Sequence, residues 1–143
     1  MLVLRHRLWN PDDPHEVHGI GIHVYGISRY VARYPQLTDD YFSPGFEFHP
    51  GMTVLDIGAI IGLFALQVLR RCEGNARVLA FEPAPQNFAY LERNLAELWP
   101  DADVQIFRCA VASASGEATF TTGRECQRCR RSRARRRNTI RMR

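Results

Sequence analysis

The stretch Val-Leu-Asp-Ile-Gly-Ala-Ile-Ile-Gly at residues 54–62 decides the fold of this 143-residue chain. Its apolar residues predict a buried strand of a parallel sheet, and its two glycines let the backbone turn tightly where that strand emerges. A second apolar run, Val-Leu-Ala-Phe-Glu-Pro at residues 78–83, also ends in a carboxylate. Open α/β sheets bind ligands where the carboxyl ends of strands meet the following turns, so Asp56 and Glu82 are the best candidate site residues.

The spacing of the glycines narrows the class of ligand. A dinucleotide fingerprint requires Gly-x-Gly-x-x-Gly, whereas here Ile60 occupies the second glycine position and Gly58 is followed by Gly62. A carboxylate at Asp56 would repel a phosphate, but it suits the ammonium group of an amino acid. Glu82 is placed to accept hydrogen bonds from a ribose diol. Because a nucleoside with a cationic amino-acid tail satisfies both ends, the sequence predicts S-adenosylmethionine as cofactor.

The chain resembles the FkbM-type methyltransferases, a branch of the class I S-adenosylmethionine-dependent enzymes. The resemblance covers about residues 41–122 and rests on residues 50–62, on Val78 to Pro85 with Asn94-Leu95 after it, and on Ala110-Val111-Ala112 leading to Gly116 and Phe120. One departure is Ile60, where the family usually has Asn. A β-branched residue tolerates positive φ poorly and cannot cap a helix, so we expect a cost on the order of 1 kcal/mol.

The resemblance implies a Rossmann-like α/β fold and transfer of the sulfonium methyl group to a hydroxyl oxygen of a small molecule, sugar or natural product. In such an in-line displacement the protein mainly supplies proximity and alignment. The cofactor-binding residues that it implies are Asp56, Gly58, Ala59 and Gly62 at the methionine end, Glu82 at the ribose and Ala110 near the adenine. It does not identify the catalytic base or the acceptor.

Apolar periodicity predicts a β-α-β-α-β succession, and hence a parallel sheet with right-handed crossovers and flanking helices. We expect strands at about residues 53–57, 77–82 and 103–108, helices at 60–71 and 85–99, and a short strand at 117–121. Nearer the N-terminus, we expect one short strand near residues 20–25 and one short helix within 27–42.

Three regions follow from this pattern. They are a loop or cap region at residues 1–45, a partial S-adenosylmethionine-binding Rossmann-like domain at 46–122, and an Arg-rich tail at 123–143 that we expect to be disordered. The family continues with further strands where this chain loses its periodicity. We therefore interpret the chain as the N-terminal half of a methyltransferase, cut short or frameshifted, with a sheet incomplete on its C-terminal side and an exposed apolar edge. A catalytically inactive remnant is the alternative.

The net charge of +4 comes from the tail. Residues 1–123 carry 9 Arg and 14 acidic residues, whereas residues 124–143 carry 10 Arg and one Glu. The chain has no Lys, and an Arg-only tract is typical of GC-rich coding sequence read out of frame. We interpret the tail first as a solvated or artefactual terminus and second as a nucleic-acid-binding arm. The tail contains no aromatic residue, which would have favoured the second interpretation.

Composition disfavours other classes of function. No apolar run approaches the roughly 20 residues that cross a bilayer, and charge begins at Arg5, so we expect no signal peptide, no membrane contact and a cytoplasmic location. Cys126-x-x-Cys129 has the spacing of a metal site. The other cysteines, Cys72 and Cys109, are expected in a helix end and a strand, so four ligands do not meet and we predict no metal. The oligomeric state is not indicated.

Overall fold

The computed structural model describes residues 10, 12–17, 22–26, 47–123 and 135–142. Its contacts divide the chain into two compact units, Met1–Phe46 and Glu47–Arg143, and each is described by itself.

The first unit contains two short strands among its described residues. Strands β1 (His15–Val17) and β2 (Ile22–Val24) pair antiparallel. The sequence predicted one strand near residues 20–25. A three-residue partner strand carries too few positions for a period to be recognised, which explains why β1 was missed. The helix predicted within residues 27–42 lies outside the described residues.

The second unit is built on a parallel three-stranded sheet in the order β3-β4-β5. Its strands are β3 (Met52–Ile57), β4 (Ala76–Phe81) and β5 (Val104–Phe107). In the register, Ile57 lies opposite Phe81, which in turn lies opposite Phe107, so all three strands end at the same edge. The strands agree with the predicted positions to within one or two residues, and the predicted Rossmann-like β-α-β-α-β succession is confirmed.

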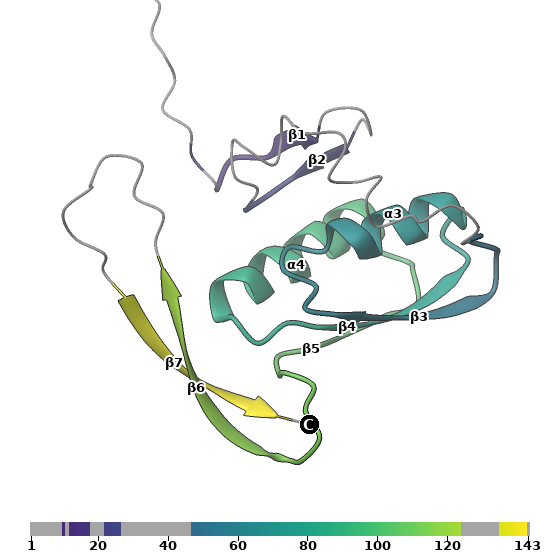
Figure 1. Cartoon of the computed structure of the whole chain (residues 1–143). Coiled ribbons are helices and arrows are strands. Elements are labelled where there is room, and N and C mark those ends of the chain that lie inside the picture. The colour runs from purple at the N-terminus through teal and green to yellow at the C-terminus, as the bar shows by residue number, and fades with distance from the viewer. Residues whose placement is uncertain (1–9, 11, 18–21, 27–46, 124–134, 143) are drawn as a thin grey trace, which may run out of the picture. The chain divides into compact units, whose positions relative to one another are not determined.

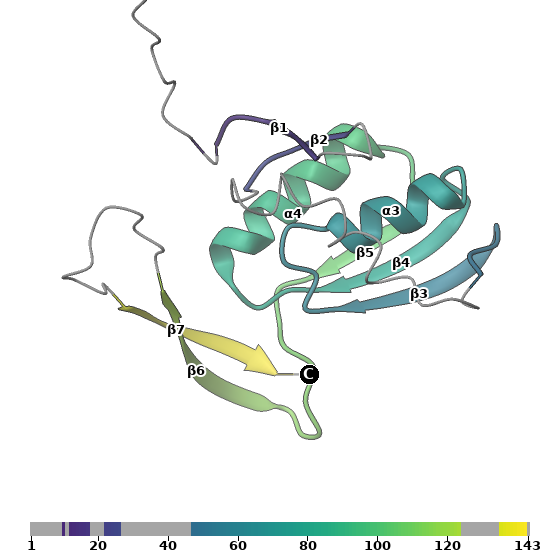
Figure 2. The same cartoon turned by 45° about the horizontal axis from the view of Figure 1, so that its top comes forward.

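Two helices connect these strands and lie on the same side of the sheet (Figures 1 and 2). They are α3 (Leu63–Arg71) and α4 (Pro85–Leu98). The first helix begins three residues later than predicted, because Ile60 and Gly62 adopt left-handed backbone conformations with φ of 53° and 89°. A right-handed helix cannot include such residues. The second helix begins at a proline, a residue that is tolerated in the first turn.

The core lies between the two helices and the sheet. Its buried apolar side chains include Val54, Val78 and Ala80 from the strands, Ala65, Leu66, Val68 and Leu69 from α3, and Leu91 and Leu95 from α4. Full burial of a Leu or Val side chain contributes about 1.5 to 3 kcal/mol.

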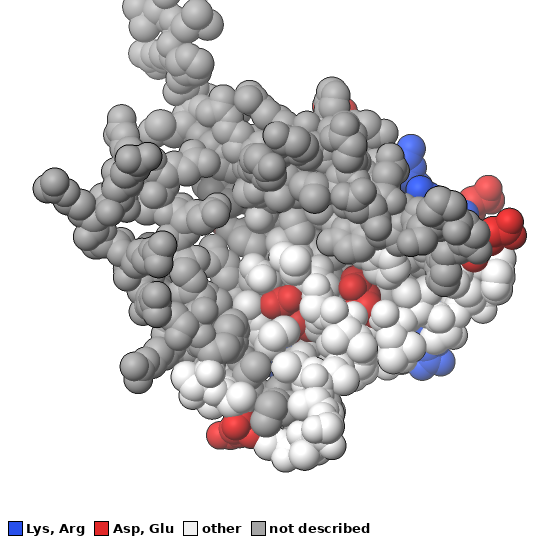
Figure 3. All heavy atoms as spheres, viewed as in Figure 1, with Lys and Arg blue, Asp and Glu red and all other residues white. Residues whose placement is uncertain are grey.

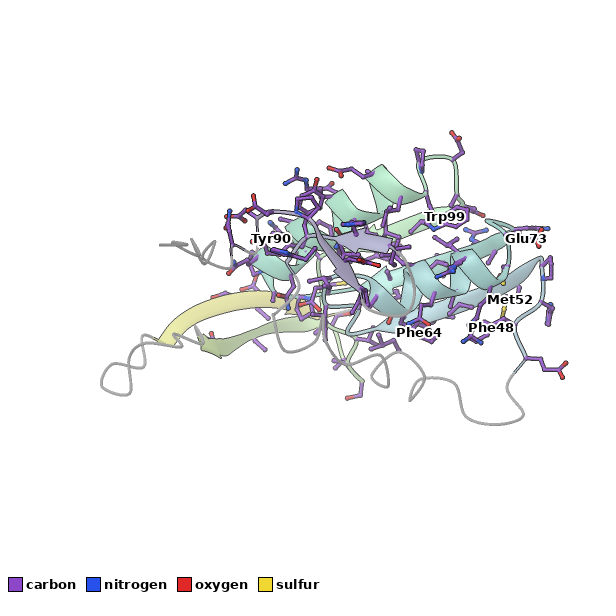
Figure 4. All side chains as sticks on the ribbon, turned by 90° about the horizontal axis from the view of Figure 1, so that it is seen from above. Phe48, Met52, Phe64, Glu73, Tyr90 and Trp99 are labelled. Carbon is purple, nitrogen blue, oxygen red and sulfur yellow. The ribbon has the colours of Figure 1, made fainter. Side chains whose placement is uncertain are left out.

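Aromatic residues close two edges of this core. The rings of Phe48 and Phe64 meet edge to face with centroids 6.3 Å apart, and Figure 4 shows them side by side. Trp99, just beyond α4, packs against Gly74, where an added Cβ would lie 3.0 Å from the indole. The indole of Trp99 therefore packs against the turn that follows α3.

The opposite face of the sheet carries exposed apolar residues. Leu55 and Ile57 are 59% and 61% exposed, and the rings of Phe81 and Phe107 stack with centroids 4.8 Å apart. Alternate residues of β3 point to opposite faces, so Val54 and Asp56 are buried while their neighbours are exposed. Parallel sheets usually have both faces covered, so an exposed apolar face on a parallel sheet is unusual.

A two-stranded antiparallel hairpin follows the sheet in the chain. Strands β6 (Gly116–Gly123) and β7 (Arg135–Met142) pair with Gly116 opposite Met142. Residues 135–142 of the Arg-rich tail, which we expected to be disordered, form a strand in the structure. Pairing depends on backbone hydrogen bonds rather than on a buried apolar period, which is why an Arg-rich segment gave no indication of it. Residues 124–134, with Cys126 and Cys129, lie outside the described residues.

Candidate functional site

The loop after β3 crosses the carboxyl end of β4. The backbone N–H groups of Gly58 and Ala59 both donate to the carbonyl oxygen of Phe81, at 2.9 and 3.0 Å. The N–H of Gly62 then donates to the carbonyl oxygen of Ala59 at 2.7 Å, which closes the turn before α3. These bonds fix the loop at the ends of two neighbouring parallel strands, the usual ligand-binding position of an open α/β sheet.

The two glycines of this loop serve different purposes. Gly58 has a φ of 84°, and a Cβ added to it would have no heavy atom of the described residues within 4 Å, so its Cα faces open space among them. Gly62 has a φ of 89°, but an added Cβ would lie 2.8 Å from Leu91 Cδ1 on α4. The absence of a side chain thus leaves room for a ligand at Gly58 and allows close helix packing at Gly62.

Glu82 fastens the loop to the turn that follows β4. Its side chain is buried, with 4% exposure. Glu82 Oε2 accepts the N–H of Ile60 at 2.8 Å, and Oε1 accepts the N–H of Ala84 at 2.8 Å and the amide of Asn87 at 3.4 Å. A carboxylate offers about four acceptor positions, so these bonds leave room for roughly one more donor. Glu82 therefore shapes the site as well as facing it.

Asp56 is a buried carboxylate with an unpaired oxygen. It is 8% exposed, and its Oδ2 has no hydrogen-bond partner among the described residues. Burial raises the pKa of Asp56 to about 6, the backbone N–H of Ala65 lowers it in part, and the negative charge of Glu82 raises it further. An unsatisfied buried acceptor is costly unless a donor or cation pairs with it. Asp56 is therefore suited to receive a positively charged ligand group.

Ile60 lies between Gly58 and Gly62 and has a left-handed backbone conformation that a β-branched residue adopts poorly. Its φ is 53°, and its side chain is 51% exposed. A β-branched residue rarely adopts this region, at a cost of order 1 to 3 kcal/mol. Its N–H donates to Glu82 Oε2, so the contact with the buried carboxylate holds the loop in this shape. The left-handed φ of Ile60 agrees with the expectation that Asn would fit better here.

The predicted residues separate into two groups in the structure. Asp56, Gly58, Ala59, Gly62 and Glu82 lie along the β3 and β4 ends and the loop between β3 and α3. Ala110 follows β5, is partly exposed, and takes no part in the hydrogen bonds that fix the loop.

Sequence reasoning missed the roles of two asparagines on α4. Asn87 donates to Glu82, and Asn94 Nδ2 donates to the carbonyl oxygen of Ile61 at 2.9 Å. Asn94 lies three residues after Leu91, on the apolar side of the helix, and is 1% exposed. A polar residue in helical register with buried leucines was the available sign of its role.

Charged side chains are sparse on the described part of the face in Figure 3, where acidic groups appear near the middle of a mostly uncharged surface. Within the described ranges, no group of three or more His, Cys, Asp or Glu side chains could hold a metal ion. None of the helices in the described residues has the length and apolar character of a membrane span.

Comparisons with known proteins agree with this geometry. The chain is 36% identical over 107 residues to the AMB antimetabolite synthetase AmbE of Pseudomonas aeruginosa, which covers 75% of the chain. It is 33% identical to methyltransferase sdnD of Sordaria araneosa over 68% of the chain, and 38% identical to the 31-O-demethyl-FK506 methyltransferase FkbM of Streptomyces tacrolimicus over 57% of the chain. No family model matches the chain.

The fold is also found in a solved structure. The methyltransferase FkbM from Methylobacillus flagellatus superposes on 74% of the chain with a TM-score of 0.50 at 19% identity. The chain spans 5%, 38% and 30% of the lengths of AmbE, sdnD and the Streptomyces FkbM, and 25% of the Methylobacillus chain. The resemblance to FkbM-type methyltransferases and the Rossmann-like fold are thereby confirmed.

Proposed function

Because the chain resembles the FkbM-type methyltransferases, we propose that it binds S-adenosylmethionine at the loop of residues 58–62 and the end of β4. We further propose that the methyl group passes to a hydroxyl oxygen of a small molecule, sugar or natural product. The observation that carries the proposal is the buried Oδ2 of Asp56, which has no hydrogen-bond partner in the described part of the chain and belongs to the strand that the open Gly58 follows.

Each end of the cofactor has a matching group in this arrangement. The ammonium of its methionine end would supply the donor that Asp56 Oδ2 lacks, and would favour the ionised carboxylate. The open space at Gly58 allows the ligand to approach the backbone closely. Glu82, with three donors already bound, keeps about one acceptor position for a ribose hydroxyl. Ala110 is the proposed neighbour of the adenine.

The cofactor would supply the reactive methyl group on its sulfonium. The chain's own residues bind and orient it: Asp56 by charge, Glu82 by hydrogen bonding, and the loop by its fixed backbone. Alignment of this kind would account for much of the rate of an in-line displacement, in which the acceptor oxygen bonds the methyl carbon as the carbon–sulfur bond breaks and the hydroxyl proton passes to a base. The residue that takes the proton of the acceptor hydroxyl is not among those assigned here.

Titration calorimetry with S-adenosylhomocysteine tests the proposed pocket. Glu82→Ala should remove most of the affinity, because it deletes a charged hydrogen-bond acceptor, worth about 1.5 to 3 kcal/mol or roughly 10- to 150-fold, and also releases Ile60. Glu82→Gln keeps one acceptor oxygen and should lose less. Glu92→Ala, an exposed change on α4, is the control. Equal affinity of wild type and Glu82→Ala would show that the pocket is elsewhere.

A further inference from the structure

Buried polar side chains hold the loop of residues 58–62, called here the cofactor loop, from two sides. Glu82 binds the N–H of Ile60, and Asn94 on α4 binds the carbonyl oxygen of the next residue, Ile61, 33 positions away in the chain. Both bonds are short, at 2.8 and 2.9 Å. Two adjacent residues of the loop are thus fixed from two different elements.

Asn94 occupies a place that packing alone would fill with an apolar residue. It is 1% exposed and lies between Leu91 and Leu95 in helical register, and both leucines are buried. Burying an amide costs free energy unless it is hydrogen-bonded, so an apolar residue would be the simpler choice for the core. The amide is retained where it reaches the backbone of Ile61, whose side chain is itself 5% exposed.

The loop needs such restraints because its backbone is not in a preferred conformation. Ile60 and Gly62, on either side of Ile61, both have positive φ, and only the glycine adopts it without strain. Strained conformations persist when surrounding contacts determine them. The contact from Asn94 restrains the residue between the two left-handed positions.

We infer that Asn94 is a positioning residue for the cofactor loop: through the carbonyl of Ile61 it keeps residues 58–62 in the shape that receives the methionine end of the cofactor. The inference rests on the proposed function. It assigns to α4 a role in ligand binding although Asn94 is too deeply buried to touch the ligand itself.

The test compares two buried amides in the full chain. Asn94→Leu removes the donor while keeping the number and branching of the side-chain heavy atoms, and Asn94→Ser is the smaller second variant. Gln67→Leu on α3 is the matched control, because Gln67 is 4% exposed but its Nε2 has no hydrogen-bond partner among the described residues. Hydrogen exchange without cofactor, calorimetry with S-adenosylhomocysteine and circular dichroism are measured for each.

We expect Asn94→Leu and Asn94→Ser to speed exchange at residues 58–62 at least 10-fold, with amides of β4 and the middle of α4 unchanged, and to weaken S-adenosylhomocysteine binding at least 10-fold. Gln67→Leu should change neither. A second change, Ile60→Asn, relieves the backbone strain and should tighten S-adenosylhomocysteine binding more in Asn94→Leu than it does in the wild type. A core residue without a positioning role would give additive effects instead.

Two results would overturn the inference. One is unchanged exchange at residues 58–62 in both Asn94 variants, and the other is additive behaviour of Ile60→Asn with Asn94→Leu in exchange and affinity. The exchange measurement needs no ligand, so it separates this inference from the proposed function. Failure of the wild type to bind S-adenosylhomocysteine, with faster loop exchange in the variants, would overturn the cofactor assignment and with it the ligand-binding role of Asn94.

Discussion

Gly58 and Gly62 share a positive φ but differ in what surrounds them, and this difference makes a testable contrast. Gly58→Ala should cost about 1 kcal/mol of unfolding free energy, since only backbone strain is added. Gly62→Ala should cost roughly 2 to 4 kcal/mol, because its Cβ also overlaps the fully buried Leu91. Urea unfolding measures both. Adding Gly62→Ala to Leu91→Ala should recover part, but not all, of the free energy of unfolding that Leu91→Ala alone loses. Equal costs of Gly58→Ala and Gly62→Ala would contradict the packing role of Gly62.

The raised pKa of Asp56 predicts a dependence of stability on pH. Its folded pKa is about 6 against an ordinary value of 3.8, so between these values the folded state holds a proton that the unfolded state has lost. Stability should therefore be greatest near pH 4 for this group, fall as pH rises towards 6, and level off above it. The difference of about 2 pKa units corresponds to on the order of 3 kcal/mol.

Asp56→Asn removes this titration. Urea unfolding across pH 4 to 8 should show the variant more stable than the wild type at pH 8, by up to about 3 kcal/mol, and similar to it near pH 4. The exposed Asp101→Asn controls for loss of one carboxylate. A wild-type stability that rises between pH 4 and 6 relative to Asp56→Asn would show that Asp56 is stabilised, not penalised, by its surroundings.

Ile60 provides the prediction for the loop as an element. Replacing it with Asn, which tolerates the left-handed region, should raise the unfolding free energy by about 1 kcal/mol and tighten S-adenosylhomocysteine binding, because less strain opposes the bound shape. Ile60→Val keeps the β-branch and is the matched control. Thermal unfolding and calorimetry measure the two effects. If Ile60→Val stabilises as much as Ile60→Asn, side-chain exposure rather than backbone strain explains the gain.

At the scale of elements, the sequence predicted what depends on apolar runs and missed what depends on distant contacts. The three parallel strands and α4 begin and end within two residues of the expected positions, because alternating or 3.6-period burial determines them. The late start of α3 depends on Ile60 meeting Glu82, 22 positions away, which no local pattern contains. The pairing of β7 is likewise a long-range backbone contact, and Gly62 could not be recognised as a packing glycine without Leu91.

For the second unit as a whole, the exposed apolar face predicts poor solubility. Leu55 and Ile57 stand more than half exposed beside the Phe81–Phe107 stack, and exposed patches of this kind favour association. The double change Leu55→Thr with Ile57→Thr keeps strand-forming residues and makes the face polar. It should raise the protein concentration at which sedimentation velocity detects aggregates, and lower the binding of a hydrophobic dye.

Val54→Thr is the matched control for this last prediction, because Val54 directly precedes Leu55 on β3 but points to the core, with 9% exposure. It should destabilise the fold by roughly 1 to 3 kcal/mol, since it buries a hydroxyl group, and should increase aggregation rather than reduce it. The Val54 and Leu55 changes should have opposite effects on aggregation, because successive side chains of a strand point to opposite faces of the sheet. Equal aggregation of the wild type and the double variant would mean that the face of Leu55 and Ile57 does not govern association.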